Sequence, residues 1–433
     1  MDTTSRGARS GSDRVPHVTC LGCGCACDDI VLTVQADRIV QAENACPLGA
    51  AWFGDGWVPG SVRLAGRECE LEEALDAAAT LLRGARGRLL VFLGEDLTCA
   101  AQRAALGLAD RLGALVDGTV SETAAAGILA GQRRGRATAT LGEIRNRADL
   151  VLYWGTDPDA RYPRYRSRYA GFPSGLHLRR GHHNRTVVSV SIGADAGPAE
   201  ADLHLPLAPE HEIGALAELR AQLLGRSLGG AARLPAELAD LAGRLVRAKY
   251  VAIVHDGEPS GERRSPDRTE GLIALAQALN GPTRAALSTL RGGGNRTGAE
   301  VVMTWQTGFP FAVDFSRGAP RYRPDRRAAE LLAANSLAAA LVVGAPGSLP
   351  EALRAGVAAL PVVAVGPRAS EAPFRVQVAI DTGVAGIHEA GLGYRMDEVP
   401  LPLRAAVPGP RSATETLQRL ADRLAAPLAE ARP

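Results

Sequence analysis

Five of the seven cysteines lie in the first 46 residues, and four of these have a spacing that suits a metal centre. Cys20, Cys23 and Cys27 follow a C-x2-C-x3-C pattern, and Cys46 precedes a proline in "NACPLG". Short spacings bring three thiolates to one face of a loop, and a fourth from further along the chain closes the site. The pattern predicts a [4Fe-4S] cluster or a tetrahedral zinc ion, because four thiolates can bind either group. The remaining alternative is a set of partly buried cysteines that hold nothing.

The other three cysteines are expected to play no part in this site. Cys25 lies between two of the proposed ligands as a bystander, and Cys69 and Cys99 are isolated, as is typical of small core residues. We expect a cytoplasmic protein, and in such a protein clustered cysteines favour metal binding over disulfides.

Bulk properties set limits on the fold and on the partners. A chain of 433 residues is long enough for two or three domains. Residues 1–16 are polar and rich in Arg and Ser, without the apolar segment of a secretory signal, so we expect a disordered tail there. The net charge is +2, Lys249 is the only lysine, and no basic run is present, so we expect no nucleic-acid partner. No apolar run is long enough to span a membrane.

The elements that must position these residues have the pattern of an α/β protein. Short apolar runs that end in Gly or Pro alternate with helical stretches, which is typical of parallel sheets. Ligands bind at the carboxyl ends of such strands, where "WGTDPD" and "VHDGEPSG" lie. A helix is predicted over 70–86, and Ser412 and Glu415 form a capping box for a helix near the end of the chain. Buried strands are predicted within 88–94, 148–158, 185–193, 249–257, 337–346 and 360–367.

Three long phrases resemble the B-type subunit of formylmethanofuran dehydrogenase, a family within the molybdopterin oxidoreductases. The most specific parts are "TWQTGFP", "AVDFSRG" and "YRMD". With the cysteine segment, the resemblance extends over nearly all of the chain after the tail. The three phrases occupy residues 140–169, 304–324 and 386–404.

The resemblance implies a fold and a domain order. A small N-terminal cysteine (iron–sulfur-type) domain is followed by two Rossmann-like α/β domains, one inserted in the other, without the superfamily's C-terminal pterin-binding barrel, which is typically a separate subunit in this family. Gly/Arg-rich and Pro-rich stretches near 131–140 and 316–327 offer crossovers. The expected domains are residues 17–60 for the cysteine domain, 61–135 with 325–433 for one α/β domain, and 136–324 for the insertion.

The redox members that this chain resembles hold tungsten or molybdenum on a bis-molybdopterin guanine dinucleotide, with a cysteine or selenocysteine as metal ligand. The matching stretch here is "VDGTVSETAAAGILAGQ", where the thiolate position falls on Thr123 and the neighbouring His position on Ala124. A threonine alcohol is protonated at neutral pH and is a far weaker ligand than a thiolate. Thr123 therefore marks the family's catalytic position in a form that we expect to be inactive.

Other departures affect residues that could handle protons. Tyr162 and Tyr165 replace histidines of the family's "H-P-R-H" phrase, and "GGGN" at 292–295 replaces "G-H-Y-N". The lysine that often bridges cluster and pterin has no candidate near the cysteines. The phrases that build the scaffold are retained, whereas those that carry the chemistry are changed.

This pattern resembles the version of the subunit in the bacterial formyltransferase/hydrolase complex of methanofuran-linked one-carbon metabolism. In that complex the hydrolysis belongs to an amidohydrolase-like subunit and the transfer to a formyltransferase subunit, together with a C-type pterin-barrel subunit. The resemblance thus implies a non-redox scaffold subunit with these partners. The alternative is an active tungsten or molybdenum dehydrogenase subunit that interconverts carbon dioxide and formate. A generic α/β interaction protein is the third interpretation.

Overall fold

The computed structural model describes residues 12–226, 228, 236–258 and 266–425. The chain divides into two compact units, the first formed by Met1–Glu122 with Gly293–Pro433 and the second by Thr123–Gly292. The division falls near 122 and 292, whereas the sequence analysis expected 135 and 324.

Contacts around Asn295 explain why the first unit takes up the chain again at Gly293. The Asn295 side chain donates to the Leu97 carbonyl at 2.8 Å and accepts from the Tyr394 amide at 2.9 Å. The helix that follows, α9 (Arg296–Thr307), packs against α3 (Cys99–Leu112). Residues 293–324 therefore belong to the first unit.

A small antiparallel sheet opens the first unit. Its strands are β1 (Asp13–Val18), β2 (Ile30–Gln35) and β3 (Arg38–Glu43), with β2 in the centre. Residues 13–16 are thus in a strand, although the sequence analysis placed them in a disordered tail. That tail's first 11 residues lie outside the described part of the chain. The strand was missed because β1 is largely exposed and has no apolar pattern.

A nine-stranded sheet forms the body of the first unit, in the order β14-β13-β7-β6-β15-β16-β17-β4-β5. The five central strands are parallel, and antiparallel strands flank them on both sides. The strands are β4 (Val62–Leu64), β5 (Arg67–Glu68), β6 (Leu89–Leu93), β7 (Leu115–Gly118), β13 (Val313–Asp314), β14 (Arg321–Tyr322), β15 (Ala339–Val343), β16 (Val362–Gly366) and β17 (Val378–Asp381).

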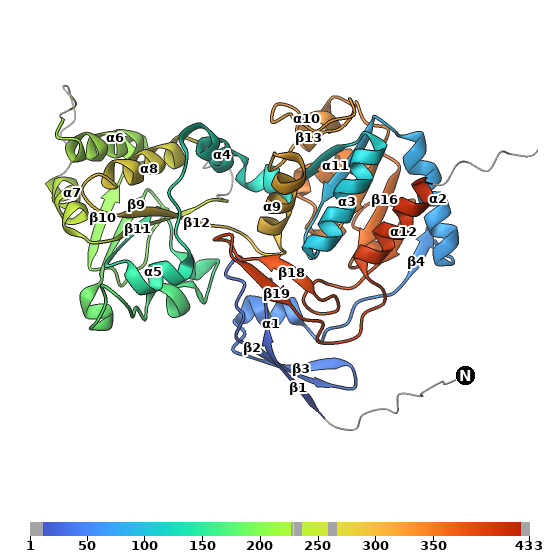
Figure 1. Cartoon of the computed structure of the whole chain (residues 1–433), viewed down its shortest axis with the longest axis horizontal. Coiled ribbons are helices and arrows are strands. Elements are labelled where there is room, and N and C mark those ends of the chain that lie inside the picture. Colours follow the sequence, from blue (N-terminus) through green and yellow to red (C-terminus); the bar gives the residue numbers. More distant parts are fainter. Residues whose placement is uncertain (1–11, 227, 229–235, 259–265, 426–433) are drawn as a thin grey trace, which may run out of the picture. The chain divides into compact units, whose positions relative to one another are not determined.

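Helices cover both faces of this sheet because its central strands are apolar on both sides. On one face α2 (Leu71–Gly84), α12 (Ala413–Ala425) and α3 lie side by side (Figure 1). On the other face α10 (Ala328–Ala333) and α11 (Glu351–Ala358) pack against β6, β15 and β16. The predicted cap of α12 is confirmed, since the Glu415 amide donates to Ser412 Oγ at 3.2 Å.

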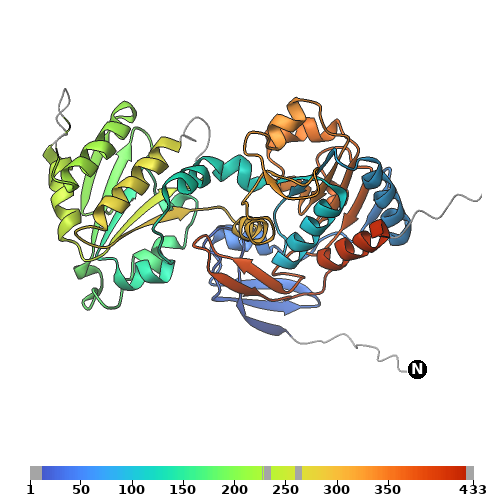
Figure 2. The same ribbon diagram turned by 45° about the horizontal axis from the view of Figure 1, so that its top comes forward.

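A hairpin from late in the sequence lies against the cysteine segment (Figure 2). It consists of β18 (Gly391–Tyr394) and β19 (Pro400–Leu403). Leu401 and Leu403 form one apolar cluster with Leu21 and Ala26, and the Met396 amide donates to the Gly24 carbonyl at 2.9 Å. The cysteine segment is therefore part of the first unit's packing.

The second unit is built on a five-stranded parallel sheet in the order β10-β9-β8-β11-β12. Along the chain, β9 and β10 are added on one side of β8, and β11 and β12 are then added on its other side. The strand order therefore has a topological switch point between β8 and β11. Crevices at the carboxyl ends of two such strands are the usual ligand sites of open α/β sheets. The strands are β8 (Leu150–Trp154), β9 (Thr186–Ile192), β10 (Leu203–Leu207), β11 (Val251–Asp256) and β12 (Ala285–Leu290).

Different kinds of segment cover the two faces of this second sheet. Helices α6 (Glu212–Leu223), α7 (Ala236–Arg247) and α8 (Pro266–Leu279) pack on one face through a large leucine-rich cluster (Figure 1). Short segments lie between the strands elsewhere: α5 (Leu141–Arg147), the 3-10 turns at Pro158–Ala160 and Gly181–Asn184, and one π-helical turn at Arg166–Ala170.

The α/β class and all six predicted buried strands are confirmed, at β6, β8, β9, β11, β15 and β16. The helix predicted over 70–86 is α2. Two further helices are α1 (Pro47–Phe53) and α4 (Thr119–Arg134). Within the described ranges, no helix has both the length and the apolar character needed to cross a bilayer.

Candidate functional site

The first three cysteines of the motif lie on a closed loop. The Cys20 amide donates to the Cys27 carbonyl at 2.8 Å, and the Ala26 amide donates to the Cys23 carbonyl at 3.2 Å. Ala26 takes a left-handed conformation with φ of 40°, which turns the chain back on itself. These bonds place both ends of the motif opposite each other.

Cys46 reaches the same place from the start of α1. It is the N-cap residue of that helix, and its carbonyl accepts from the Ala50 amide at 2.8 Å. One turn on, a methyl group added at Gly49 would lie 3.2 Å from the Cys20 sulfur and 3.9 Å from the Cys46 sulfur. Both sulfurs therefore lie within 4 Å of one point above Gly49, and a side chain at that position would crowd the Cys20 sulfur.

Burial keeps the Cys20 thiol uncharged. It raises the pKa of Cys20 well above its usual range, and the neighbouring Cys23, Cys27 and Cys46 raise it further. Cys23, Cys27 and Cys46 thus lie close enough to Cys20 to affect its ionisation. As they stand, no three His, Cys, Asp or Glu side chains in the described ranges are close enough to hold one metal ion.

The remaining cysteines lie where small core residues are expected. Cys25 is fully buried, and Cys99 is buried at the start of α3 with its sulfur 3.7 Å from Asn295 Nδ2. Cys69 is partly buried beside β5. None of the seven cysteines, all of which lie in the described ranges, forms a disulfide.

Thr123, which the sequence analysis matched to the family's metal-binding thiolate, lies in α4 as the first residue of the second unit. Its side chain is half-buried, and Ala124 beside it is buried. The cysteines belong to the first unit, so the two predicted sites fall in different units.

A buried aspartate before α4 was missed by the sequence analysis. Asp117 lies near the end of β7 and accepts hydrogen bonds from the amides of Gly118 at 3.0 Å, Ala312 at 3.4 Å and Ala328 at 2.7 Å. Burial raises the pKa of Asp117 to about 6 despite these bonds. An acidic residue directly after the apolar pair in "LVDG" was the available signal.

Ion pairs fill the carboxyl ends of β8 and β11 in the second unit. Arg161 bonds to Asp256 at 2.5 Å. Arg291 bonds to Glu258 at 3.1 Å, with side chains only 6% and 1% exposed. Each of these guanidiniums is paired with a carboxylate of this strand end.

A third guanidinium at this edge is paired in the same way. Arg268 bonds to Glu212 at 2.5 and 2.9 Å, and the Trp154 ring nitrogen donates to the same carboxylate at 2.8 Å. A further Asp195 oxygen lies 3.8 Å from Arg268. The strand ends are thus charge-balanced by the protein's own side chains.

The corresponding edge of the first unit is acidic. The strand order of its sheet has a topological switch point between β6 and β15. Glu95 there pairs with Arg296 at 2.5 Å, and Asp96 accepts from the Trp52 ring nitrogen at 3.1 Å. Burial raises the pKa of Asp96.

These residues do not fit the pterin dinucleotide that the resemblance implies. Its phosphates need cationic or amide donors, whereas the guanidiniums at both edges already bind carboxylates. The metal position offers the Thr123 alcohol in place of a thiolate. We therefore assign no chemical step to that cofactor.

Other departures from the family pattern have structural roles here. Tyr162 and Tyr165 are buried in the second unit. Gly293 of the "GGGN" phrase packs against the backbone of Leu21 and Cys23, and Asn295 fastens the start of α9. The glycines thus support the cysteine loop.

The buried His255 at the end of β11 makes a pH-dependent contribution to stability. Its Nε2 lies 3.2 Å from Thr289 Oγ1, and burial, together with the Arg136 and Arg268 guanidiniums, lowers its pKa to about 3. The unfolded chain binds a proton with a pKa near 6.5. Stability from the neutral ring is therefore complete above pH 6.5 and is lost as the pH falls toward 3. Between about pH 7.5 and 5 we expect a loss of about 2 kcal/mol.

Urea unfolding of wild type and His255→Gln at the two pH values measures this contribution. The variant should lose less stability than wild type between them, by about 2 kcal/mol. His204→Gln, an exposed histidine of β10, is the control and should behave as wild type. Equal pH dependence in H255Q and wild type would show that the ring is not held neutral.

Comparisons with known proteins identify relatives of the whole chain. The chain is 33% identical over 325 residues to the B subunit of the tungsten-containing formylmethanofuran dehydrogenase 2 of Methanocaldococcus jannaschii, covering 72% of this chain and 74% of the relative. The protein of the same name from Methanococcus maripaludis is 32% identical over 326 residues, with the same shares covered. No family model matches the chain.

Two matches come from Methylorubrum extorquens. The B subunit of its formyltransferase/hydrolase complex Fhc is 31% identical over 274 residues, covering 61% of this chain and 67% of the relative. The crystal structure of the complex FhcABCD with methylofuran contains a chain that matches with a TM-score of 0.70 and 29% identity. That match covers 84% of this chain and 98% of the solved chain.

Proposed function

The chain belongs to the family of formylmethanofuran dehydrogenase B subunits, and on that premise we propose that it is the B-type subunit of a formyltransferase/hydrolase complex. Its role there is that of a scaffold without redox chemistry of its own, in methanofuran-linked one-carbon metabolism. The solved relative that supports this assignment belongs to such a complex and was crystallised with methylofuran.

The observation that carries the non-redox role is the charge balance at the strand ends. Arg161, Arg268 and Arg291 are each paired with carboxylates of the same unit. A dinucleotide diphosphate would have to displace these carboxylates, and the buried Glu258 would then lose its partner in a low-dielectric site. A redox relative needs this edge to receive an anion.

The partners follow from the same proposal. We propose that the chain assembles with an amidohydrolase-like subunit, a formyltransferase subunit and a C-type pterin-barrel subunit, as the resemblance implies. The FhcABCD name of the solved complex supports an assembly of several different subunits. We place this assembly in the cytoplasm.

We further propose that Cys20, Cys23, Cys27 and Cys46 form a small N-terminal domain around a [4Fe-4S] cluster. Support comes from the Cys20 and Cys46 sulfurs, which both lie within 4 Å of one point above Gly49. Further support comes from Cys23, Cys27 and Cys46, which add to the effect of burial in raising the pKa of Cys20. A zinc ion needs four sulfurs within about 4 Å of one another, because each lies about 2.3 Å from the same metal. An iron–sulfur cluster accepts sulfurs that lie farther apart, since each thiolate binds a different iron. Its role in this subunit is to hold the loop folded.

The second candidate is an active tungsten or molybdenum dehydrogenase subunit. The intact cysteine set favours it, because a redox enzyme needs a route for electrons. The first two relatives carry tungsten in their names. The threonine at position 123 and the ion pairs at the strand ends argue against this candidate.

Metal analysis of the complex purified without oxygen separates these candidates. We expect roughly four iron atoms per chain for a [4Fe-4S] cluster, and neither tungsten nor molybdenum. In a Cys20→Ser complex the iron and its visible absorption should be lost, whereas Cys69→Ser, outside the loop, should retain both.

Three other results would each correct one part of this proposal. Tungsten or molybdenum at one per chain, with pterin, would establish the dehydrogenase instead. Zinc in place of iron would overturn the cluster and leave the scaffold standing. Iron retained in C20S would remove Cys20 from the ligand set.

A further inference from the structure

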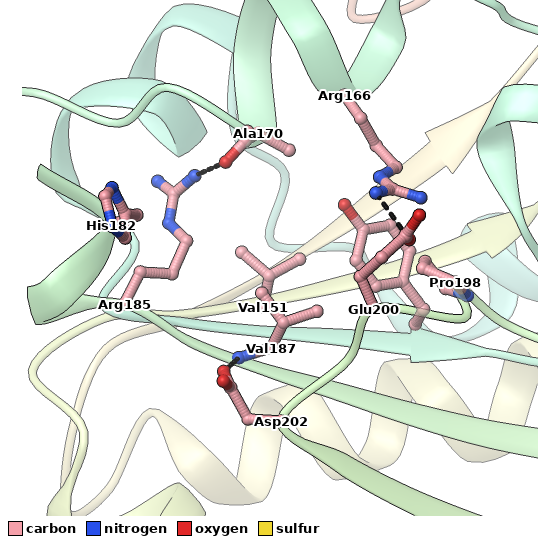
Figure 3. Close-up of a pocket in the computed structure, with 11 residues that line it drawn as sticks. Val151, Arg166, Ala170, His182, Arg185, Val187, Pro198, Glu200 and Asp202 are labelled. Atoms are coloured by element: carbon pink, nitrogen blue, oxygen red, sulfur yellow. Dashed lines mark hydrogen bonds and ion pairs between the residues drawn. The ribbon is translucent and has the colours of Figure 1, made fainter.

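A cavity of about 250 Å³ lies within the second unit, on the face of the sheet that carries Val151 and Tyr153 (Figure 3). Segments of irregular helix, Arg166–Ala170 and Gly181–Asn184, contribute to its wall. The cavity is remote in sequence from the cysteine motif and lies entirely in one unit. It is lined by Val151, Tyr153, Arg166, Ala170, Gly171, His182, Arg185, Val187, Pro198, Glu200 and Asp202.

The inner wall holds a buried cation. Arg185 is 8% exposed. Its Nε donates to the Ala148 carbonyl at 2.8 Å, its Nη2 to the carbonyls of Ile144 at 2.5 Å and Arg145 at 3.3 Å, and its Nη1 to Ala170 (Figure 3). Every one of these acceptors is neutral. In the part of the chain that the structure describes, Arg185 forms no ion pair.

A buried cation with no carboxylate in ion-pair contact is unusual in a folded protein, and Asp149 acts on this one only from a longer distance. Burial lowers the pKa of Arg185 to about 10, which still leaves the group charged at neutral pH. Four hydrogen bonds use four of the five guanidinium N–H groups, and the fifth is on Nη1. The carbonyl dipoles hold the cation in place, and a carboxylate in the cavity would supply the missing charge.

The rest of the wall selects the kind of anion. Val151, Val187 and Ala170 present apolar surface to the cavity (Figure 3). An apolar cavity of about 150 Å³ accommodates benzene, so this one has room for a ring and a carboxylate.

Acidic side chains at the exposed rim limit the charge of the ligand. Glu200 is exposed and bonds to Arg166 at 2.8 Å. Asp202, also exposed, accepts from the Val187 amide at 2.7 Å. Both are held near the opening and would repel a phosphate or other polyanion more strongly than a single carboxylate.

We propose that this cavity binds a small monocarboxylate, with its carboxylate against Arg185 and its apolar body against Val151 and Val187. The site is independent of the proposed function. It takes the chemical class of a ring-sized or branched organic acid, and it discriminates against neutral isosteres and phosphates.

Three probes on the unaltered full-length chain test the proposal by ligand-observed NMR and calorimetry. Benzoate should bind at least tenfold more tightly than benzamide, which has the same shape without the charge. Inorganic phosphate should not compete with it. Equal binding of benzoate and benzamide, or displacement of benzoate by phosphate, would overturn the proposal.

A variant that fills the cavity tests where benzoate binds. Val187→Phe puts a ring into the proposed space and should weaken benzoate at least tenfold, whereas Val246→Phe, on an exposed position of α7, should leave it unchanged. Unchanged binding in a folded V187F protein would place the benzoate elsewhere and refute the site. If V187F does not fold, the probe series decides, since it needs no variant.

Discussion

Gly293→Ala is expected to destabilise the first unit by about 3 kcal/mol, because a side chain there has no room and its neighbours are backbone. The added methyl group would overlap the Leu21 carbonyl oxygen and lie 2.8 Å from the Cys23 amide nitrogen. The next amide, Gly294, donates to that same carbonyl at 2.8 Å, so moving Leu21 away would also lose this bond. The cysteine loop would have to shift, and with the cluster proposed above, iron should be lost as well.

Chemical unfolding followed by tryptophan fluorescence measures this effect, since Trp52 packs beside the cysteine loop. Gly107→Ala is the matched control, because that position in α3 has open space around it. Alanine there should stabilise the helix by roughly 0.5–1 kcal/mol. A G293A protein as stable as wild type would show that the loop does not depend on this close approach.

Six strands of the two central sheets could be predicted because their burial leaves a continuous apolar run. Runs such as "LLVFL" and "VVAVG" are β6 and β16, with every residue buried. The small N-terminal sheet could not be predicted in this way. Four of the six residues of β1 and three of the six residues of β3 are exposed, so neither strand shows an apolar period. Contacts made elsewhere in the chain decide their pairing.

The residues that support the cysteine loop could not be predicted from the sequence. Spacing alone makes Cys20, Cys23 and Cys27 candidate ligands, because they are neighbours in the chain. The glycines that make room for them cannot be recognised by spacing, since Gly293 comes from some 270 residues away. A glycine needed for close approach has the same sequence appearance as one in a flexible turn.

The paired strand ends could not be predicted either, and they change how the family resemblance is interpreted. Sequence analysis located "VHDGEPSG" at a ligand site from topology alone, and Asp256 and Glu258 do lie at that edge. What decides their chemistry is the arginine that each one meets, and Arg161 and Arg291 come from other loops. The motif therefore locates the strand end, whereas the charge balance there depends on side chains from elsewhere in the chain.

Arg185→Met is expected to destabilise the second unit by about 4 kcal/mol, the largest effect that we predict. Its guanidinium satisfies the carbonyls of Ala148 and Ala170, and it shares the Ile144 carbonyl with the Ala148 amide. All three carbonyls belong to buried residues. Methionine fills similar volume and donates nothing. Each buried acceptor left without a donor costs about 1–3 kcal/mol, while removing a desolvated charge returns part of that sum.

Trp154 reports on this unit, because it is the one tryptophan between residues 123 and 292 and is fully buried. Arg147→Met, in the same helix-and-strand neighbourhood, removes an exposed ion pair with Glu143 and should cost less than about 1 kcal/mol. Arg185→Lys should recover little of the stability lost in R185M. A single ammonium cannot reach all of the carbonyls that the planar guanidinium contacts on its several sides. If the free energy of unfolding of R185M is within about 1 kcal/mol of that of wild type, water satisfies those carbonyls, and the cavity wall does not depend on Arg185. A large loss in R185M together with a small loss in R147M would establish that the buried cation holds this face of the sheet together.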